Sequence, residues 1–468
     1  MTVAVVGLVT VLVFVMLGYQ FNRADGKIEQ GGLVQFDTKP NGATVTIDGA
    51  SFGTRTPAKS TLDAGQHFVT MKRDGYHSWQ KSVDVVAGSV LWLNYARLIP
   101  TEMTPSTVES FTGAASTAVS PDNRWIAVEE NASTPVIHLL DISGDSVATT
   151  SLTLPKASYT SPTTKKESFT VSAWDPGSRY LLIKHSYDTI KNEWIVLDRS
   201  NATAAKNITA LLDIDATKLL FSNNDSNTMY AQIDHAIRKI DIKHATLSRP
   251  LVSNVAEFSL YDASTLTYVT KPEAKTGQRT VGYYDDGASK SRTIRTYPKG
   301  APSLHLAIGK YYDDPYVSIA YGDTVEILRG TLPRSDSNDT SSLSAVATVA
   351  VPGGVSYLSA KTNGRFVVAQ QSASFTVYDL ELKKMTTTKL SGDTKVSGEL
   401  RWLDGYSLWS NQDGTIRTYE FDGANQHDIM PATQGTSVSL SANGKYLYGF
   451  TTDKNGTVHL VRVQLQLS

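Results

Sequence analysis

A unit of about 40 to 50 residues recurs from about residue 110 to the end of the chain, and this repeat constrains the fold more than any other feature. Each unit contains a short strand, a polar turn, an apolar strand and an alternating strand. Units begin near residues 115, 168, 213, 256, 303, 355, 398 and 436. Periods of this length with about four strands are typical of β-propeller blades. The sequence therefore predicts an all-β propeller of seven or eight blades over residues 101–468.

The last unit contains only three strand patterns and ends near Gln466. A propeller whose ring stays open leaves two unpaired sheet edges, and such edges promote aggregation. We therefore expect residues 101–113 to supply the missing strand and to close the ring from the N-terminal side.

The turns of the repeat carry a second signal. Four of them read "SPDNR", "DPGSR", "KTNGR" and "SANGK". These turns resemble the S-P-D-G-[RK] turn of TolB-type and other WD-related propellers. The resemblance covers most of residues 105–466 and concerns architecture, so it implies no particular activity.

A smaller β-rich segment precedes the propeller, at residues 33–100. Turn signals at Lys39–Gly42 and at Asp48-Gly49 separate short alternating runs, with further strands expected at 66–72, 79–86 and 90–98. The segment resembles a PEGA domain, with "PNGA" in place of the name-giving "PEGA". The matching residues are Pro40, Gly42-Ala43, Ile47-Asp48-Gly49, Thr56-Pro57, Leu62, Gly65, His67, Gly75-Tyr76 and Trp79. The resemblance implies a small β-sandwich-like module, often found near the membrane in prokaryotic surface proteins, without enzymatic activity.

The N-terminus is an uncharged apolar run from Thr2 to Leu17. Eighteen helical residues span roughly 27 Å, which is close to the thickness of a bilayer core. We expect a transmembrane anchor at residues 1–19 and a polar linker at 20–32. A cleaved signal peptide is the alternative, although no basic start and no small-x-small cleavage site are present. Arg23 and Lys27 favour a cytoplasmic body, whereas the PEGA resemblance favours an extracytoplasmic one, which is our expectation.

Composition and motifs exclude several classes of site. Lysine plus arginine number 44 and aspartate plus glutamate 45, so the net charge of −1 gives no reason to expect nucleic acid as a partner. Cysteine is absent, which excludes disulfides and thiolate metal ligands. The nine histidines form no metal-binding motif, and the sequence contains no nucleotide-binding glycine loop. We expect no cofactor and no metal.

One catalytic motif is present, at Gly49-Ala50-Ser51-Phe52-Gly53, which fits G-x-S-x-G. That nucleophile elbow requires a preceding strand, a following helix and an α/β sheet. Here it lies within the all-β module, so we interpret it as a turn and expect no catalytic residue.

Tyrosine pairs followed by aspartates suggest a ligand site. The motif "YYDD" occurs twice, in neighbouring repeat units. Aromatic rings beside carboxylates can bind sugars or peptides through stacking and hydrogen bonds. The alternative is that the tyrosines are buried and the aspartates form turns. The candidate ligand-binding residues are Tyr283, Tyr284, Asp285, Tyr311, Tyr312 and Asp313.

Other residues carry weaker expectations. Leu62, Tyr76 and Trp79 are expected in the core of the small module, with sugar stacking by Trp79 or Trp92 as the alternative. Two Ser/Thr-rich insertions, at 155–166 and 331–344, are expected to be flexible loops.

Together these features predict a membrane-anchored binding or scaffold protein of the cell envelope. Its expected partners are the membrane through the N-terminal helix and envelope proteins or cell-wall glycans through the propeller. One alternative is an extracytoplasmic propeller enzyme that acts on glycans or hydrolyses its substrate. A second is a scaffold that faces the cytoplasm.

Overall fold

The structure is a computed structural model of the whole chain. It describes residues 5–9, 12–13, 19–21, 28–164, 166–188, 191–223, 225–300, 302–360, 364–390, 400–411 and 413–467. Near the N-terminus, residues 5–9 and 12–13 are helical. The chain then forms a two-stranded hairpin of β1 (Tyr19–Phe21) and β2 (Ile28–Gln30).

The prediction of a transmembrane helix at residues 1–19 is wrong for this structure. Within the described residues, no helix has both the length and the apolar character needed to cross a membrane. A span needs about 20 helical residues, whereas the chain is already extended at β1. The prediction relied on apolar composition alone, which does not fix helix length. Residues 1–4, 10–11 and 14–18 of the predicted anchor, and 22–27 of the predicted linker, lie outside the described residues.

The small N-terminal module consists of two sheets. One has the strand order β6-β3-β9 and the other β5-β4-β7-β8. Alternate residues of β3 and β8 are buried, as expected for strands with one face against a core. At the β4–β5 turn, Asp48 and Gly49 have φ values of 49° and 83°, so the predicted hairpin turn is confirmed. The strands are β3 (Gly32–Lys39), β4 (Thr44–Ile47), β5 (Ala50–Arg55), β6 (Ala58–Leu62), β7 (Gly65–Lys72), β8 (Trp79–Val85) and β9 (Val90–Arg97).

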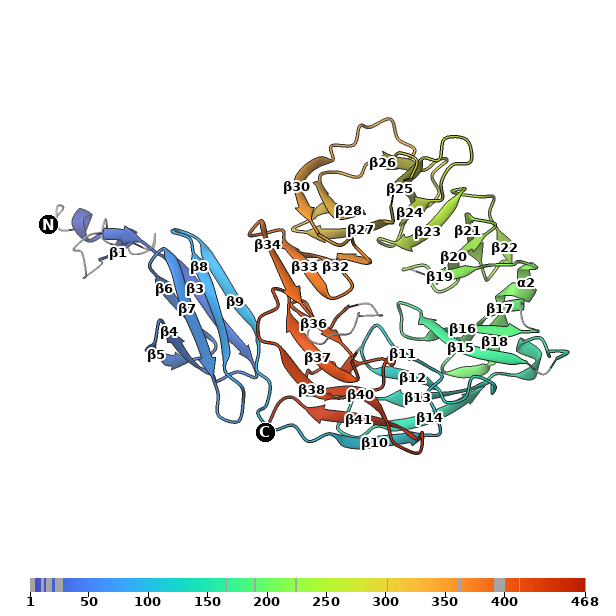
Figure 1. Cartoon of the computed structure of the whole chain (residues 1–468), viewed down its shortest axis with the longest axis horizontal. Helices are drawn as coiled ribbons and strands as arrows, with labels where there is room; N and C mark the ends of the chain where they lie inside the picture. Colours follow the sequence, from blue (N-terminus) through green and yellow to red (C-terminus); the bar gives the residue numbers. More distant parts are fainter. Residues whose placement is uncertain are drawn as a thin grey trace.

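The rest of the chain is a β-propeller (Figure 1). In the described part, eight four-stranded antiparallel sheets follow one another around a ring, which decides between seven and eight blades. Blade 1 contains β11 (Ser116–Val119), β12 (Trp125–Glu129), β13 (Val136–Asp141) and β14 (Ala148–Thr153), and blade 2 contains β15 (Glu167–Trp174), β16 (Tyr180–Tyr187), β17 (Lys191–Asp198) and β18 (Asn201–Asn207). Blade 3 contains β19 (Lys218–Phe221), β20 (Thr228–Ile233), β21 (Ala236–Asp241) and β22 (Thr246–Leu247), and blade 4 contains β23 (Val255–Leu260), β24 (Thr265–Thr270), β25 (Arg279–Asp285) and β26 (Arg292–Tyr297). The short helices η1 (Lys156–Ser158) and α2 (Ile208–Leu212) lie between strands of these blades.

Blades 5 to 8 complete the ring. Blade 5 contains β27 (Leu304–Tyr311), β28 (Asp314–Tyr321), β29 (Thr324–Arg329) and β30 (Ser344–Ala350), and blade 6 contains β31 (Tyr357–Ala360), β32 (Phe366–Gln370), β33 (Ser374–Asp379) and β34 (Lys384–Lys389). Blade 7 contains β35 (Arg401–Trp402), β36 (Ser407–Ser410), β37 (Thr415–Glu420) and β38 (His427–Pro431), and blade 8 contains β39 (Ser439–Leu440), β40 (Tyr446–Thr452) and β41 (Val458–Gln464) with β10 (Ser106–Phe111).

Blade 8 closes the ring in the predicted way. β10 precedes blade 1 in the sequence but pairs antiparallel with β41, the last strand of the chain. The order β10-β41-β40-β39 gives blade 8 its fourth strand. The expectation that residues 101–113 supply this strand is therefore confirmed.

The hydrophobic core is divided among the boundaries between blades. Seven clusters each join two neighbouring blades, because each sheet buries its faces against the sheets beside it. The eighth cluster differs: it joins blades 6 and 7 and continues into the small module. Figure 1 shows this module beside the ring, next to the blades that contain β34 and β36. The two parts of the molecule thus share one core.

Candidate functional site: the cleft between module and propeller

Aromatic side chains dominate the contact between the small module and the propeller. Tyr95 of β9 stacks on Tyr406 of blade 7, with ring centroids 4.6 Å apart and an interplanar angle of 15°. Phe421 meets the same Tyr95 ring edge-on at 5.6 Å. Trp79 is buried beside Tyr95, so its predicted place in a core is confirmed. These contacts remove a large apolar area from water and fix the angle between the two parts.

A buried lysine adds charge pairing to this contact. The Lys81 Nζ lies 2.6 Å from Glu420 Oε2 and 2.9 Å from Asp422 Oδ2. Trp79 Nε1 donates to the other Glu420 oxygen. Burial alone would lower the pKa of Lys81, but the surrounding acidic groups outweigh it and the net pKa is raised. Lys81 therefore stays charged, and the propeller carboxylates compensate that charge.

The polar rim of the contact is also paired. Arg97 of β9 donates to Asp404 Oδ2 at 2.8 Å, and Leu467 N donates to the Tyr76 hydroxyl at 2.6 Å. The imidazole rings of His77 and His427 lie 5.2 Å apart. Burial and the neighbouring His77 lower the pKa of His427 to about 4, so the ring is neutral at physiological pH.

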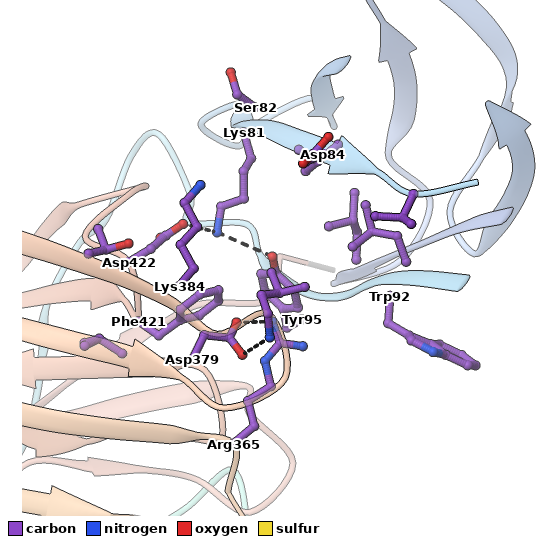
Figure 2. A pocket seen from close by; sticks show the side chains of 17 residues that line it. Lys81, Ser82, Asp84, Trp92, Tyr95, Arg365, Asp379, Lys384, Phe421 and Asp422 are labelled. Carbon is purple, nitrogen blue, oxygen red and sulfur yellow. Dashed lines mark hydrogen bonds and ion pairs between the residues drawn. The ribbon is translucent and has the colours of Figure 1, made fainter. Parts of the chain in front are cut away.

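A cavity of about 270 Å³ lies between β8, β9 and the outer strands of blade 6. Figure 2 shows Lys81, Tyr95, Arg365 and Asp379 gathered around it, while the Trp92 indole extends away from this charged cluster. Arg365 donates to Asp379 Oδ2 at 2.5 Å and also to Glu381. Arg365 is thus paired with carboxylates of blade 6 beside the cavity.

Trp92 also lines a second and more open hollow of about 630 Å³ between the module and blades 5 to 7. We call it the aromatic cleft. Of the residues that line it, Trp92 is 44% exposed and Tyr312 is 78% exposed. The cleft is lined by Trp92, Asn94, Tyr311, Tyr312, Gly364, Arg365, Phe366, Glu381, Gly405 and Tyr406.

The predicted tyrosine sites separate into two groups. Tyr311 lies at the end of β27 and Tyr312-Asp313 form the two-residue turn to β28, with φ values of 47° and 68° at the turn residues. Tyr311 and Tyr312 line the aromatic cleft, and the exposed Asp313 pairs with Lys310 at 2.9 Å. The structure therefore places two of these predicted residues, Tyr311 and Tyr312, at the cleft, and their role in binding stays a prediction.

Tyr283, Tyr284 and Asp285 lie instead in β25 of blade 4 and line none of the cavities described above. Both tyrosines are buried; Tyr283 donates to Pro333 O and Tyr284 to Ala288 O. The Asp285 carboxylate accepts from Ser335 N at 2.6 Å. The insertion at 331–344, which we expected to be flexible, is therefore hydrogen-bonded to blade 4.

Ser51, the centre of the G-x-S-x-G motif, lies in β5 and pairs with Thr46 across the hairpin. The described chain after β5 continues into β6 rather than a helix, so the motif lacks the context of a nucleophile elbow. Gly49 lies in the hairpin turn, whereas Ser51 lies in a strand and not in the turn that we expect. Among the described residues, no cluster of three or more histidine, aspartate or glutamate side chains could hold a metal ion.

Sequence reasoning missed Asn94, Arg365, Glu381 and Tyr406. Arg365 had a detectable signal, because it follows the turn of a repeat unit. In blades 1 and 2 the equivalent Arg124 and Arg179 pair with Asp141 and Asp198 in the third strand. Blade 6 uses the same pair, Arg365 with Asp379, and places it at the cleft.

Comparisons with known proteins agree with this division of the chain. The PEGA domain family matches residues 32–98, so the predicted resemblance is confirmed for the small module. No curated protein matches the chain.

Two solved structures are similar to this chain in fold. The β-propeller domain of Cps50 (Swd1) from Myceliophteria thermophila is 12% identical, with a TM-score of 0.40 and coverage of 70% of this chain and 100% of that one. Tricorn protease is 11% identical, with a TM-score of 0.43; the match covers 77% of this chain and 38% of the tricorn chain. Both likenesses concern the β-propeller architecture alone.

Proposed function

We propose that this chain is a binding or scaffold protein of the cell envelope, in which the PEGA module and the propeller act as one rigid body. The observation that carries the proposal is the shared core, with Lys81 buried against Glu420 and Asp422 at its edge. A buried and paired charge favours one relative placement of the two parts, because any other leaves a charge unpaired. Fixed in this way, they enclose a cleft that neither part could form alone.

The aromatic cleft is the proposed contact surface. Large exposed rings beside fixed polar groups are typical of ligand and partner sites. Envelope proteins and cell-wall glycans are the candidate partners. The PEGA match supports an extracytoplasmic location, because this module is typical of surface proteins.

Binding without turnover fits the chemistry of the cleft better than catalysis. Its carboxylate, Glu381, is engaged by Arg365, and so is the neighbouring Asp379. A hydrolytic site needs a nucleophile and a base, or two carboxylates free to exchange protons. We therefore propose that the protein is not an enzyme.

Site-specific cross-linking would test this function. A photoreactive phenylalanine analogue placed at position 312 should capture a protein or glycan of the envelope in producing cells. The same analogue at position 68 is the control, because Phe68 is also an exposed aromatic residue, at 45%, but lies outside the cleft. Equal capture at both positions would contradict the proposed surface.

The proposed lack of activity has its own test. Purified full-length chain, incubated with cell-wall polysaccharide, should release no reducing ends above a buffer blank. Release that disappears on substitution of a carboxylate would establish the enzymatic alternative instead.

A further inference from the structure

Two exposed rings line the aromatic cleft, one from each part of the molecule. Trp92 belongs to β9 of the PEGA module, and Tyr312 belongs to the β27–β28 turn of blade 5. Their exposed fractions, 44% and 78%, are high for such large apolar side chains. Exposed rings that line one hollow are available to stack on a ligand bound in it.

These rings stand on a rigid support. Tyr312 is held in a two-residue turn and packs on Tyr311, with ring centroids 4.4 Å apart. Trp92 lies in β9, whose Tyr95 stacks on Tyr406. A ligand would therefore meet preformed surfaces, and little conformational entropy would be lost on binding.

The charges of the cleft are already neutralised. Arg365 is paired with both Asp379 and Glu381, as the corresponding arginines are paired in other blades. The exposed Asn94 is neutral, and burial together with Glu381 raises the pKa of Tyr311, so its hydroxyl keeps its proton. Since no unpaired charge of a described residue lines the cleft, it suits a ligand without net charge.

The hydrogen-bonding groups of the cleft narrow the ligand class further. Glu381 is one-third exposed and can only accept, Arg365 can only donate, and Asn94 can do both. A sugar hydroxyl both donates and accepts, so it can satisfy each of these groups. A proline-rich peptide, the other common ligand of aromatic grooves, offers mainly carbonyl acceptors and would give the exposed part of the Glu381 carboxylate no donor.

We propose that the aromatic cleft binds a neutral saccharide, with pyranose rings stacked on Trp92 and Tyr312 and hydroxyls bonded to Asn94, Arg365 and Glu381. This assignment rests on the proposed function and specifies its ligand. The ring faces cover the C–H face of the sugar, and the polar groups between them fix its orientation.

Calorimetric titration of the full chain tests the assignment. The probes are three neutral hexasaccharides, namely β-1,4-linked N-acetylglucosamine, β-1,4-linked glucose and α-1,4-linked glucose, together with a hexaproline peptide. We expect at least one hexasaccharide to bind. Trp92→Ala and Tyr312→Ala should each weaken that binding by at least about tenfold, because each removes a stacking surface.

Two control variants separate stacking from general damage to the protein. Phe68→Ala removes an aromatic ring that is about as exposed as Trp92 and lies elsewhere in the PEGA module, and it should leave the affinity unchanged. Tyr312→Phe keeps the ring and should bind within about threefold of the native chain. Thermal unfolding of each variant checks that the fold is intact.

The outcomes distinguish this assignment from the proposed function. Failure of all three hexasaccharides to bind, or binding that survives both alanine substitutions, overturns the saccharide assignment. If hexaproline binds in a Trp92-dependent way while the sugars do not, the cleft remains a binding surface with a peptide ligand. If no probe binds and position 312 captures nothing in cells, both proposals fail.

Discussion

Glu129, at the end of β12 in blade 1, is a carboxyl group with 0% exposure. Ser116 Oγ donates to its Oε2 at 2.6 Å, while Oε1 has no hydrogen-bond partner. Burial raises the pKa of Glu129 to about 7, against the smaller effect of the Ser116 hydrogen bond. The same Ser116 hydroxyl accepts from Val171 N of blade 2 at 2.9 Å, so this one residue lies beside a contact between two blades.

This raised pKa predicts that the protein loses stability as the pH rises. Below about pH 4.5 the carboxyl is protonated in both folded and unfolded chains, so its burial does not lower the free energy of unfolding. Between about 4.5 and 7 the unfolded chain ionises first, and the free energy of unfolding falls by about 3 kcal/mol and then levels off. We expect Glu129→Gln to remove this loss and to be more stable than the native chain at pH 8, as measured by urea unfolding from pH 4.5 to 8.

The neighbouring Glu130 provides the control. Thr112 donates to Glu130 and lowers the pKa of that carboxyl, so Glu130→Gln should not remove the loss of stability at high pH. An unchanged pH profile in Glu129→Gln would contradict the prediction.

At the scale of a single element, β10 holds the ring closed. It pairs along its length with β41, and Phe111 at its end is buried in the cluster between blades 8 and 1. Without β10, the edge of β41 loses its partner and the cluster loses an aromatic side chain. The strand therefore contributes more to the stability of the propeller than its short length suggests.

Deletion of residues 101–113 should abolish folding or cause aggregation, because an unpaired edge strand attracts other chains. The soluble fraction and the sedimentation profile measure this effect. Replacing 101–105 with a Gly/Ser linker of equal length keeps β10 and should give soluble protein. A soluble, folded deletion product would show that β10 is dispensable for closure.

The whole molecule depends on how the PEGA module is joined to blades 6 and 7. Trp79, Lys81 and Tyr95 of the module are buried against Glu420, Asp422 and Phe421 of the propeller. A chain whose two parts share a core should unfold as one cooperative unit. This shared core keeps the two parts that line the aromatic cleft in a fixed position relative to each other.

Lys81→Ala should destabilise the protein by about 3–5 kcal/mol and separate the unfolding of the two parts, because it leaves Glu420 uncompensated in a buried site. The control is Lys445→Ala, which breaks an exposed pair with Asp145 at 2.8 Å and should cost far less stability than Lys81→Ala, because water screens exposed charges. Urea unfolding followed by tryptophan fluorescence measures both. A Lys81→Ala cost no larger than that of the control would mean that the buried pair does not couple the two parts.

The architecture could be predicted because its signals are local. Turn residues such as Asp48-Gly49 and the repeated turns that end in Arg or Lys set where strands begin, and alternation sets which face is buried. Repetition then multiplies these weak signals, since each unit predicts the same four strands. The ring closure by residues 101–113 followed from counting strands in the last unit.

The transmembrane helix and the Tyr283 site were predicted less well, for a physical reason. An apolar run is compatible with several structures, and its letters do not say how long a helix will be. Two identical "YYDD" motifs differ only in their surroundings: Tyr312 occupies an exposed hairpin turn, whereas Tyr283 is covered by the loop at 331–344.

The sequence alone determined the two kinds of β module, their order and the means of ring closure, because periodicity and turn chemistry act over a few residues. Only the tertiary structure decided that Lys81 meets Glu420 and that Trp92 and Tyr312 line the same cleft. Those pairs are far apart in the chain, and they meet through the packing of whole sheets, which no short pattern encodes.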